Sequence, residues 1–169
     1  MNLPGDLLAQ ARLLTTKEPR RPKQASLRRA VSAAYYALFH LLVHDASRRF
    51  VRSSKRAALR QCLRRAFDHA SMRRVARQFA ARGVSPKLSP GLNEQPLQEG
   101  LVTVALTFVD LQQHRHEADY DLRRTFTRHE VLGIIHRAER AVRNWCSVRG
   151  SVQADTLLIG LLAFEKMRG

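Results

Sequence analysis

Apolar residues recur along most of the chain at intervals of three and four positions, which is the spacing of one face of an α-helix. No run shows the strict alternation that is typical of a β-strand. The pattern therefore predicts an all-α, up-and-down helical bundle of about seven helices, four of them long. The expected helices cover about residues 6–14, 22–47, 54–68, 71–83, 97–119, 128–150 and 155–166.

Several of these helices begin with a recognisable capping signal. Ser53 or Ser54 is expected to cap the third helix and Ser71 the fourth, because a serine side chain accepts hydrogen bonds from the free N–H groups of a first turn. Thr127 and Glu130 match a Thr-x-x-Glu capping box. The sixth helix should therefore begin directly after the threonine.

The chain has 169 residues, of which 44% are hydrophobic, enough for an ordinary core. The prolines of residues 84–96 predict one loop, and we expect a single domain over residues 1–169. The longest mainly apolar run, residues 30–43, is too short to cross a bilayer, and no signal peptide is expected at the start. Cys62 and Cys146 form no metal or disulfide pattern. We expect a soluble, cytoplasmic protein without a cofactor.

The helix predicted over residues 22–47 is apolar on most sides, which is typical of a central helix. Its polar stripe consists of Arg29, Ser32, Tyr36, His40 and Ser47, with His44 beside it. Polar groups withdrawn from water need partners, so Tyr36 and His40 should form hydrogen bonds. The stripe is either a satisfied part of the core or the lining of a cleft. His40 and His44 have the spacing of a metal-binding pair, but no third ligand accompanies them, so no metal is predicted.

The fifth helix carries an arginine on its apolar side. Arg115 continues the apolar seam formed by Leu97, Leu101, Val104, Phe108 and Leu111. An arginine at such a place is costly unless it is paired, and Asp119, one turn later, can pair with it. Two interpretations remain: a structural ion pair at the helix end, or an arginine held at the mouth of a cleft to bind phosphate. His116 is adjacent but points about 100° round the helix, given 3.6 residues per turn.

The formal net charge is +16, and it is unevenly distributed. Residues 1–88 carry all of this excess, and residues 89–169 are balanced. The densest stretch, residues 48–82, has twelve basic residues against one acidic residue, which is a reasonable footprint for a polyanion. Arginine suits phosphate because its planar fork donates two parallel hydrogen bonds. We expect Arg64, Arg65, Arg73 and Arg74 to bind a nucleic-acid backbone; the alternative is a merely solvated face.

Two segments resemble HEPN-domain proteins. The segment from Leu27 to His40, LRRAVSAAYYALFH, resembles the long second helix of that family. The segment from Arg115 to Leu122, RHEADYDL, resembles its arginine motif in the version Arg-x-x-Ala-Asp-Tyr. The resemblance covers roughly residues 25–148. It implies an all-α bundle that forms homodimers. In many members the dimer cleft is a metal-independent ribonuclease site, and such proteins act as toxins, in antiviral defence or in RNA processing.

The family's nuclease signature is an arginine followed, after four to six residues, by a histidine. In this chain Tyr120 stands five residues after Arg115. A tyrosine hydroxyl is a poor proton shuttle at neutral pH. We therefore expect Arg115 to contact the phosphate and Asp119 to orient it, while the acid–base role stays open between His116 and Tyr120. His114 is a more remote candidate.

Three functions follow as alternatives. In the first, the protein acts on RNA as an endoribonuclease or RNA binder, with Tyr36 and His40 lining the same cleft as Arg115. In the second, it is a catalytically inactive HEPN module that dimerises or binds a protein partner such as a small nucleotidyltransferase. In the third, it binds nucleic acid without specificity through residues 48–82.

Overall fold

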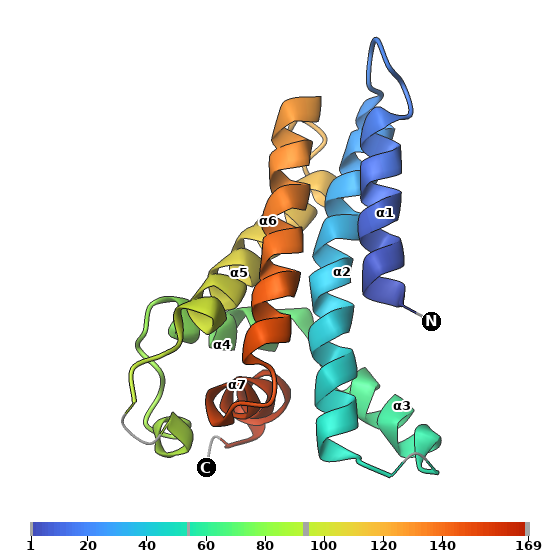
Figure 1. Ribbon diagram of the computed structural model, residues 1–169. Helices are drawn as coiled ribbons and strands as arrows, with labels where there is room; N and C mark the ends of the chain where they lie inside the picture. Colours follow the sequence, from blue (N-terminus) through green and yellow to red (C-terminus); the bar gives the residue numbers. More distant parts are fainter. Residues whose placement is uncertain (1, 54, 93–94, 168–169) are drawn as a thin grey trace. The chain divides into compact units, whose positions relative to one another are not determined.

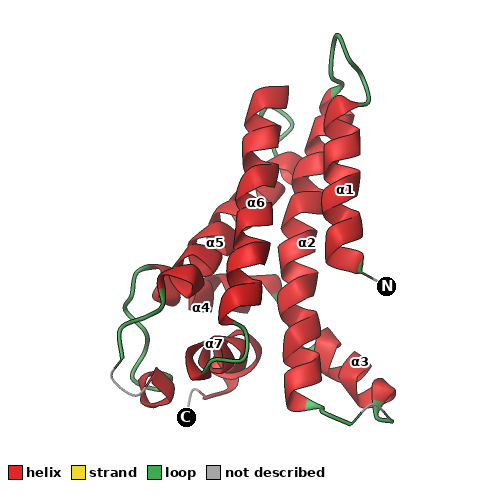
Figure 2. Cartoon of the chain, viewed as in Figure 1, coloured by secondary structure: helices red, strands yellow, loops and turns green. Residues whose placement is uncertain are grey.

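The computed structural model describes residues 2–53, 55–92 and 95–167 of the chain (Figures 1 and 2). These residues form seven α-helices and two short 3₁₀-helices and contain no strand, so the predicted all-α fold class is confirmed. In chain order the elements are α1 (Leu3–Thr16), α2 (Gln24–Phe50), α3 (Ala57–Arg65), α4 (His69–Ala80), η1 (Ser89–Leu92), α5 (Glu99–Tyr120), α6 (Arg128–Val148), α7 (Val152–Ala163) and η2 (Phe164–Met167).

The chain divides into two compact units. The first unit comprises Met1–Leu41 and Thr107–Arg143, and the second comprises Leu42–Leu106 and Asn144–Gly169. Helices α2, α5 and α6 each contribute residues to both units. The expectation of a single domain stays a prediction.

The core of the first unit is built around α2. Within residues 30–41 every residue is buried except Tyr36 and His40. Tyr35 is fully buried, and its ring centroid lies 5.7 Å from that of Phe108 on α5. The expectation of a central second helix is therefore confirmed within this unit, and the two residues that interrupt its burial both belong to the predicted polar stripe.

Two arginines from elsewhere in the first unit bind the C-terminal ends of α5 and α1. Neither helix has a basic residue in its own last turn, although its free carbonyl groups favour positive charge. Arg28 donates to the carbonyl oxygens of Ala118 at 2.8 Å and Asp121 at 2.9 Å. It also donates to the carbonyl oxygens of Glu117 and Arg124. These bonds hold the end of α5 against α2.

The second of these arginines, Arg128, joins the end of α1 to the start of α6. Arg128 donates from Nε to the carbonyl oxygen of Thr15 at 3.1 Å and from Nη1 to that of Pro19 at 2.9 Å. Its Nη2 donates to the carbonyl oxygen of Glu18. Helix α6 itself begins at the predicted residue, and both bonds of the capping box with Thr127 are present.

In the second unit, α4 packs against α7, and η1 also contacts α7. A side chain at Gly160 would displace its neighbours, because a Cβ atom there would lie 2.8 Å from a methyl carbon of Leu88 and 2.9 Å from one of Val75. The buried Trp145 donates its indole N–H to Asp45 at 2.8 Å. None of the helices that the structure describes combines the length and the apolar character needed to cross a membrane.

Some predicted helix boundaries were wrong. Helix α4 begins at His69 because Asp68, not Ser71, is its cap: the carboxylate accepts from the N–H groups of Ala70 and Ser71. For the same reason the third helix ends at Arg65 rather than reaching position 68. An aspartate that follows a helix-like pattern is easily read as the helix's last residue.

Other boundaries shifted by a few residues. Helix α7 begins at Val152 rather than 155, since the side chain of Ser151 caps it. At the N-cap position of α3 stands Arg56, which makes no side-chain cap bond, so Ser53 is not the cap, and Ser54 lies outside the described residues. The predicted loop of residues 84–96 contains the short helix η1.

We predict that Arg28→Met lowers the free energy of unfolding by about 2–4 kcal/mol, because several carbonyl groups lose a charged donor at once. The matched control is Arg29→Met, whose side chain has no protein partner among the described residues and should change stability by less than about 0.5 kcal/mol. Chemical denaturation followed by circular dichroism measures both. Equal losses of stability in the two variants would contradict the proposed role of Arg28 in holding the end of α5.

Candidate functional site

Arg115 lies near the C-terminal end of α5, where the apolar seam of this helix stops. The seam residues before it, including Phe108 and Leu111, are buried as predicted. The Arg115 side chain is only 18% exposed, and its Nε lies 2.7 Å from Oδ2 of Asp119. The predicted ion pair is therefore present. From Nη2, Arg115 also donates to the hydroxyl of Tyr36 at 3.1 Å.

The carboxylate of Asp119 is held from both sides. Its Oδ2 faces Arg115, and its Oδ1 accepts a hydrogen bond of 2.7 Å from the hydroxyl of the buried Ser32. Helices α2 and α5 are thus joined by a continuous polar network inside the first unit. Because each partner lies largely out of water, this network orients the guanidinium and does not leave it free to sample many positions.

Aromatic rings flank the guanidinium. The carbon at its centre lies 5.6 Å from the ring centroid of Tyr36 and equally far from that of Tyr120, within the range of a cation–π contact. The ring of His40 stacks on Tyr36 at 5.8 Å, and the ring of His116 lies 5.1 Å from Tyr120. We refer to Ser32, Tyr36, His40, Arg115, His116, Asp119 and Tyr120 as the Arg115 cluster.

The structure thus brings together the residues that the sequence assigned to one cleft. Tyr120 is 64% exposed and His116 is exposed, so the cluster reaches the surface on its α5 side. The second terminal nitrogen of Arg115, Nη1, has no acceptor among the described residues. The arrangement can therefore present a fixed positive charge, between two tyrosine rings, to an anion at the surface.

His114 belongs to a different group of charges. Its Nε2 lies 3.3 Å from Asp110, and its Nδ1 lies 3.6 Å from Glu117. The hydrogen bond to Asp110 raises the pKa of His114 above its ordinary value, although burial opposes this shift. The same bond lowers the pKa of Asp110, and Arg137 contacts this carboxylate at 3.0 Å. His114 is therefore occupied in an ion-pair network.

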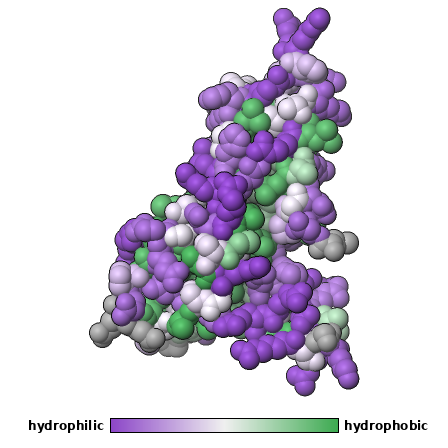
Figure 3. Space-filling view, in the orientation of Figure 1, coloured by the Kyte–Doolittle hydropathy of each residue, from purple (hydrophilic) through white to green (hydrophobic). Residues whose placement is uncertain are grey.

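The four arginines expected to bind a nucleic-acid backbone belong to the second unit. Arg64 and Arg65 lie in the last turn of α3, a helix without a buried residue. Arg64 donates to the hydroxyl of Ser47 at 3.1 Å, and Arg74 forms an ion pair of 2.9 Å with Glu165. Arg73 is half-buried. Hydrophilic side chains cover most of α3 in the view of Figure 3.

Arg28 is a residue that the sequence reasoning missed. It holds the end of α5 by donating to backbone carbonyl groups, among them that of Ala118, three residues after Arg115. Such bonds leave no side-chain pattern in the sequence. Gln24 was missed as well: its side-chain amide donates to the carbonyl of Phe126 at 2.8 Å and accepts from the N–H of the same residue at 2.9 Å. The one feature of the sequence that could have pointed to Arg28 was the lack of a basic residue in the last turn of α5.

No three His, Cys, Asp or Glu side chains in residues 2–53, 55–92 and 95–167 are grouped so that they could hold a metal ion. A comparison of the chain with models of protein families, with curated proteins and with solved structures found no match. The chemistry of the cluster itself is therefore the basis for assigning a function.

We predict that His114→Gln destabilises the protein most at about pH 5–6 and least at about pH 9. A histidine with a raised pKa stabilises the fold below its ordinary value near 6.5, and this contribution is lost as the pH rises through the folded-state value. Asp110, with a lowered pKa, contributes above about pH 4. The expected difference in free energy of unfolding is below about 1 kcal/mol at its maximum, since solvent screens a pair whose side chains are 19% and 43% exposed.

Denaturation curves of the two proteins at several pH values measure this difference. Asp110→Asn should give a similar profile between pH 5 and pH 9, because it removes the partner of the imidazole. A difference that stays constant from pH 5 to pH 9 would show that the His114–Asp110 pair does not contribute.

Proposed function

We propose that this chain is a HEPN-like protein that acts on RNA and that the Arg115 cluster contacts the RNA phosphate. The observation that supports this most is the environment of Arg115: its guanidinium forms an ion pair with Asp119 and a hydrogen bond to Tyr36, and its Nη1 has no acceptor in the described part of the chain. A pre-oriented guanidinium loses little freedom when it binds a phosphate. The net charge of +16 favours a polyanionic partner.

The surrounding rings fit the same partner. Single-stranded RNA presents flat bases that stack on aromatic side chains, and arginine adds its own planar surface. The exposed Tyr120 and the neighbouring ring of His116 offer such surfaces at the rim of the cluster. Of the two segments that resemble HEPN proteins, the first lies on α2 and the second begins in the last turns of α5, and these two helices carry every residue of the cluster.

The proposed reaction is cleavage of RNA without a metal. The ribose 2′-oxygen attacks the adjacent phosphorus, the bond to the 5′-oxygen of the next nucleotide breaks, and a 2′,3′-cyclic phosphate and a 5′-hydroxyl form. Arg115 stabilises the charge that develops on the phosphate. His116, whose exposed ring lies 5.1 Å from that of Tyr120, takes up the proton of the 2′-hydroxyl, and the departing 5′-oxygen receives a proton from water.

We predict that the pure protein cleaves single-stranded RNA in the presence of EDTA and that Arg115→Ala lowers the rate at least about 100-fold, the loss typical of one charge-stabilising donor. The control is Arg123→Ala, an exposed arginine of the same unit whose side chain has no partner among the described residues. Gel analysis of several RNAs measures cleavage. Intact RNA after incubation with wild-type protein would exclude the ribonuclease activity.

A second candidate function is supported by one observation. Arg115 is already paired with Asp119 and bonded to Tyr36, and Tyr120 stands where the nuclease signature has a histidine. We propose as the alternative that the protein is a catalytically inactive HEPN-like module that forms homodimers or binds a partner protein such as a small nucleotidyltransferase. In that case the cluster serves mainly to join α2 to α5.

The structural role predicts that Arg115→Ala lowers the free energy of unfolding by about 2 kcal/mol, less than the ~3–5 kcal/mol of a fully buried pair because the side chain is partly exposed. Asp119 and the hydroxyl of Tyr36 would be left without their charged partner. Thermal melting of this variant, with Arg123→Ala as the reference, measures the loss. An unchanged melting temperature would rule out a structural role for the pair.

A further inference from the structure

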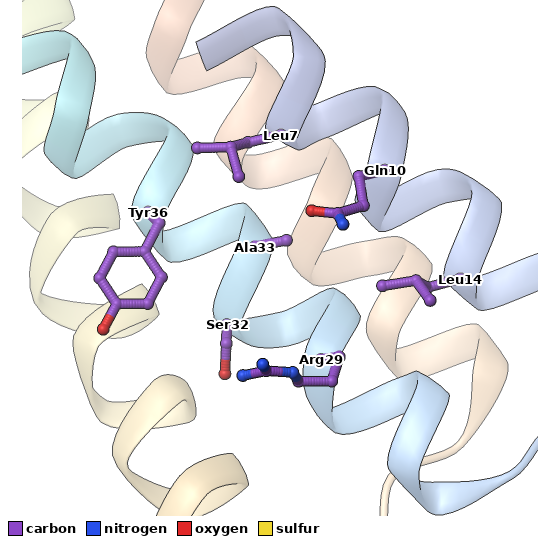
Figure 4. A pocket seen from close by; sticks show the side chains of 7 residues that line it. All are labelled: Leu7, Gln10, Leu14, Arg29, Ser32, Ala33 and Tyr36. Carbon is purple, nitrogen blue, oxygen red and sulfur yellow. The ribbon is translucent and has the colours of Figure 1, made fainter. Parts of the chain in front are cut away.

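A groove lies between α1 and α2 in the first unit, with a volume of about 300 Å³ (Figure 4). Leu7, Gln10 and Leu14 line it from α1, and Arg29, Ser32, Ala33 and Tyr36 line it from α2. Its size is at the lower end of the range for small-molecule sites.

The groove shares a wall with the Arg115 cluster. Ser32 and Tyr36 line the groove, and the same two side chains bond Asp119 and Arg115 on α5. In Figure 4 the ring of Tyr36 points away from α1, while the guanidinium of Arg29 extends along α2 on the side of Ser32. A ligand in the groove would therefore lie next to one bound at Arg115, separated from it by a single layer of side chains.

Some polar groups of the groove already have partners in the protein, and others do not. The hydroxyls of Ser32 and Tyr36 take part in the network described above. By contrast, the side chains of Arg29 and Gln10 are exposed and have no protein partner within the described residues. Arg29 is also the only charged side chain among the seven that line the groove. The groove thus combines one unpaired guanidinium and one amide with a strip of aliphatic side chains.

We propose that this groove binds one nucleotide of the RNA, next to the nucleotide whose phosphate contacts Arg115. Arg29 binds the phosphate, since a guanidinium donates two hydrogen bonds to it. The base lies against Leu7, Leu14 and Ala33, and the amide of Gln10 bonds the edge of the base, as glutamine does with adenine. This assignment rests on the proposed function, because it extends the same RNA site from α5 across α2 to α1.

The test compares variants that are matched in charge and size. Arg29→Ala removes the charge in the groove, and Arg21→Ala removes another exposed charge without a partner in the described part of this unit. Gln10→Trp fills the groove, whereas Ala9→Trp places the same ring on a neighbouring exposed position of α1 that does not line it. Binding of a fluorescent single-stranded RNA is measured at fixed salt concentration, because phosphate contacts depend on salt.

We expect Arg29→Ala and Gln10→Trp to weaken RNA binding about tenfold more than their controls, the loss of one charge-assisted contact. Equal effects of Arg29→Ala and Arg21→Ala, together with equal effects of the two tryptophan variants, would overturn the groove assignment while leaving RNA binding at Arg115 intact. Adenosine 5′-monophosphate provides a second probe that does not need RNA binding. It should shift the NMR signal of the Gln10 side-chain amide in the wild type and not in Arg29→Ala.

The two probes separate the failure of this proposal from the failure of the proposed function. If the wild type binds no RNA but the mononucleotide shifts Gln10 in an Arg29-dependent way, the groove is a nucleotide site and the RNA function is wrong. If neither RNA nor the mononucleotide binds, both proposals are wrong.

Discussion

The position of the candidate site depends on how the C-terminal end of α5 is held. A helix end carries carbonyl groups without partners inside the helix, and α5 has no cation of its own in its last turn. Arg28 supplies the missing donors from α2. Together with the bonds of Asp119 to Ser32 and of Arg115 to Tyr36, these contacts hold the last turns of α5 against α2, and the side chains of Arg115 and Asp119 project from just these turns.

In the proposed function, the Arg115 cluster serves both the stability of the fold and the binding of a phosphate. A partly buried arginine needs a counter-charge, which Asp119 supplies, and Asp119 in turn is held by Ser32. The same bonds that make the burial tolerable also orient the guanidinium toward the tyrosine rings. For this reason a structural and a functional role of Arg115 do not exclude each other, and measurements of stability and of RNA cleavage report on different consequences of one geometry.

The net charge of +16 overstates the positive surface that is free to bind a partner. Arginine greatly outnumbers lysine in this chain, and many of its arginines are engaged in internal contacts with carboxylates or carbonyl groups. These include Arg12, Arg28, Arg49, Arg60, Arg124, Arg128 and Arg137. A planar group with five donors can satisfy several carbonyl oxygens at once, so it serves as an internal connector as readily as a phosphate ligand.

Local patterns in the sequence were sufficient for much of this structure. Periodicity predicted the helices, the Thr-x-x-Glu signal placed the start of α6, and the four-residue spacing of Arg115 and Asp119 predicted their ion pair, because all of these depend on neighbours within one or two turns. The hydrogen bond between Arg115 and Tyr36 joins residues that are 79 positions apart, and the bond from Arg28 to the carbonyl of Ala118 joins residues that are 90 positions apart. Such contacts depend on which faces of two distant helices meet and on backbone atoms that every residue possesses. Only the folded chain could therefore decide that Arg28 binds carbonyls while Arg29, its neighbour, lines an open groove.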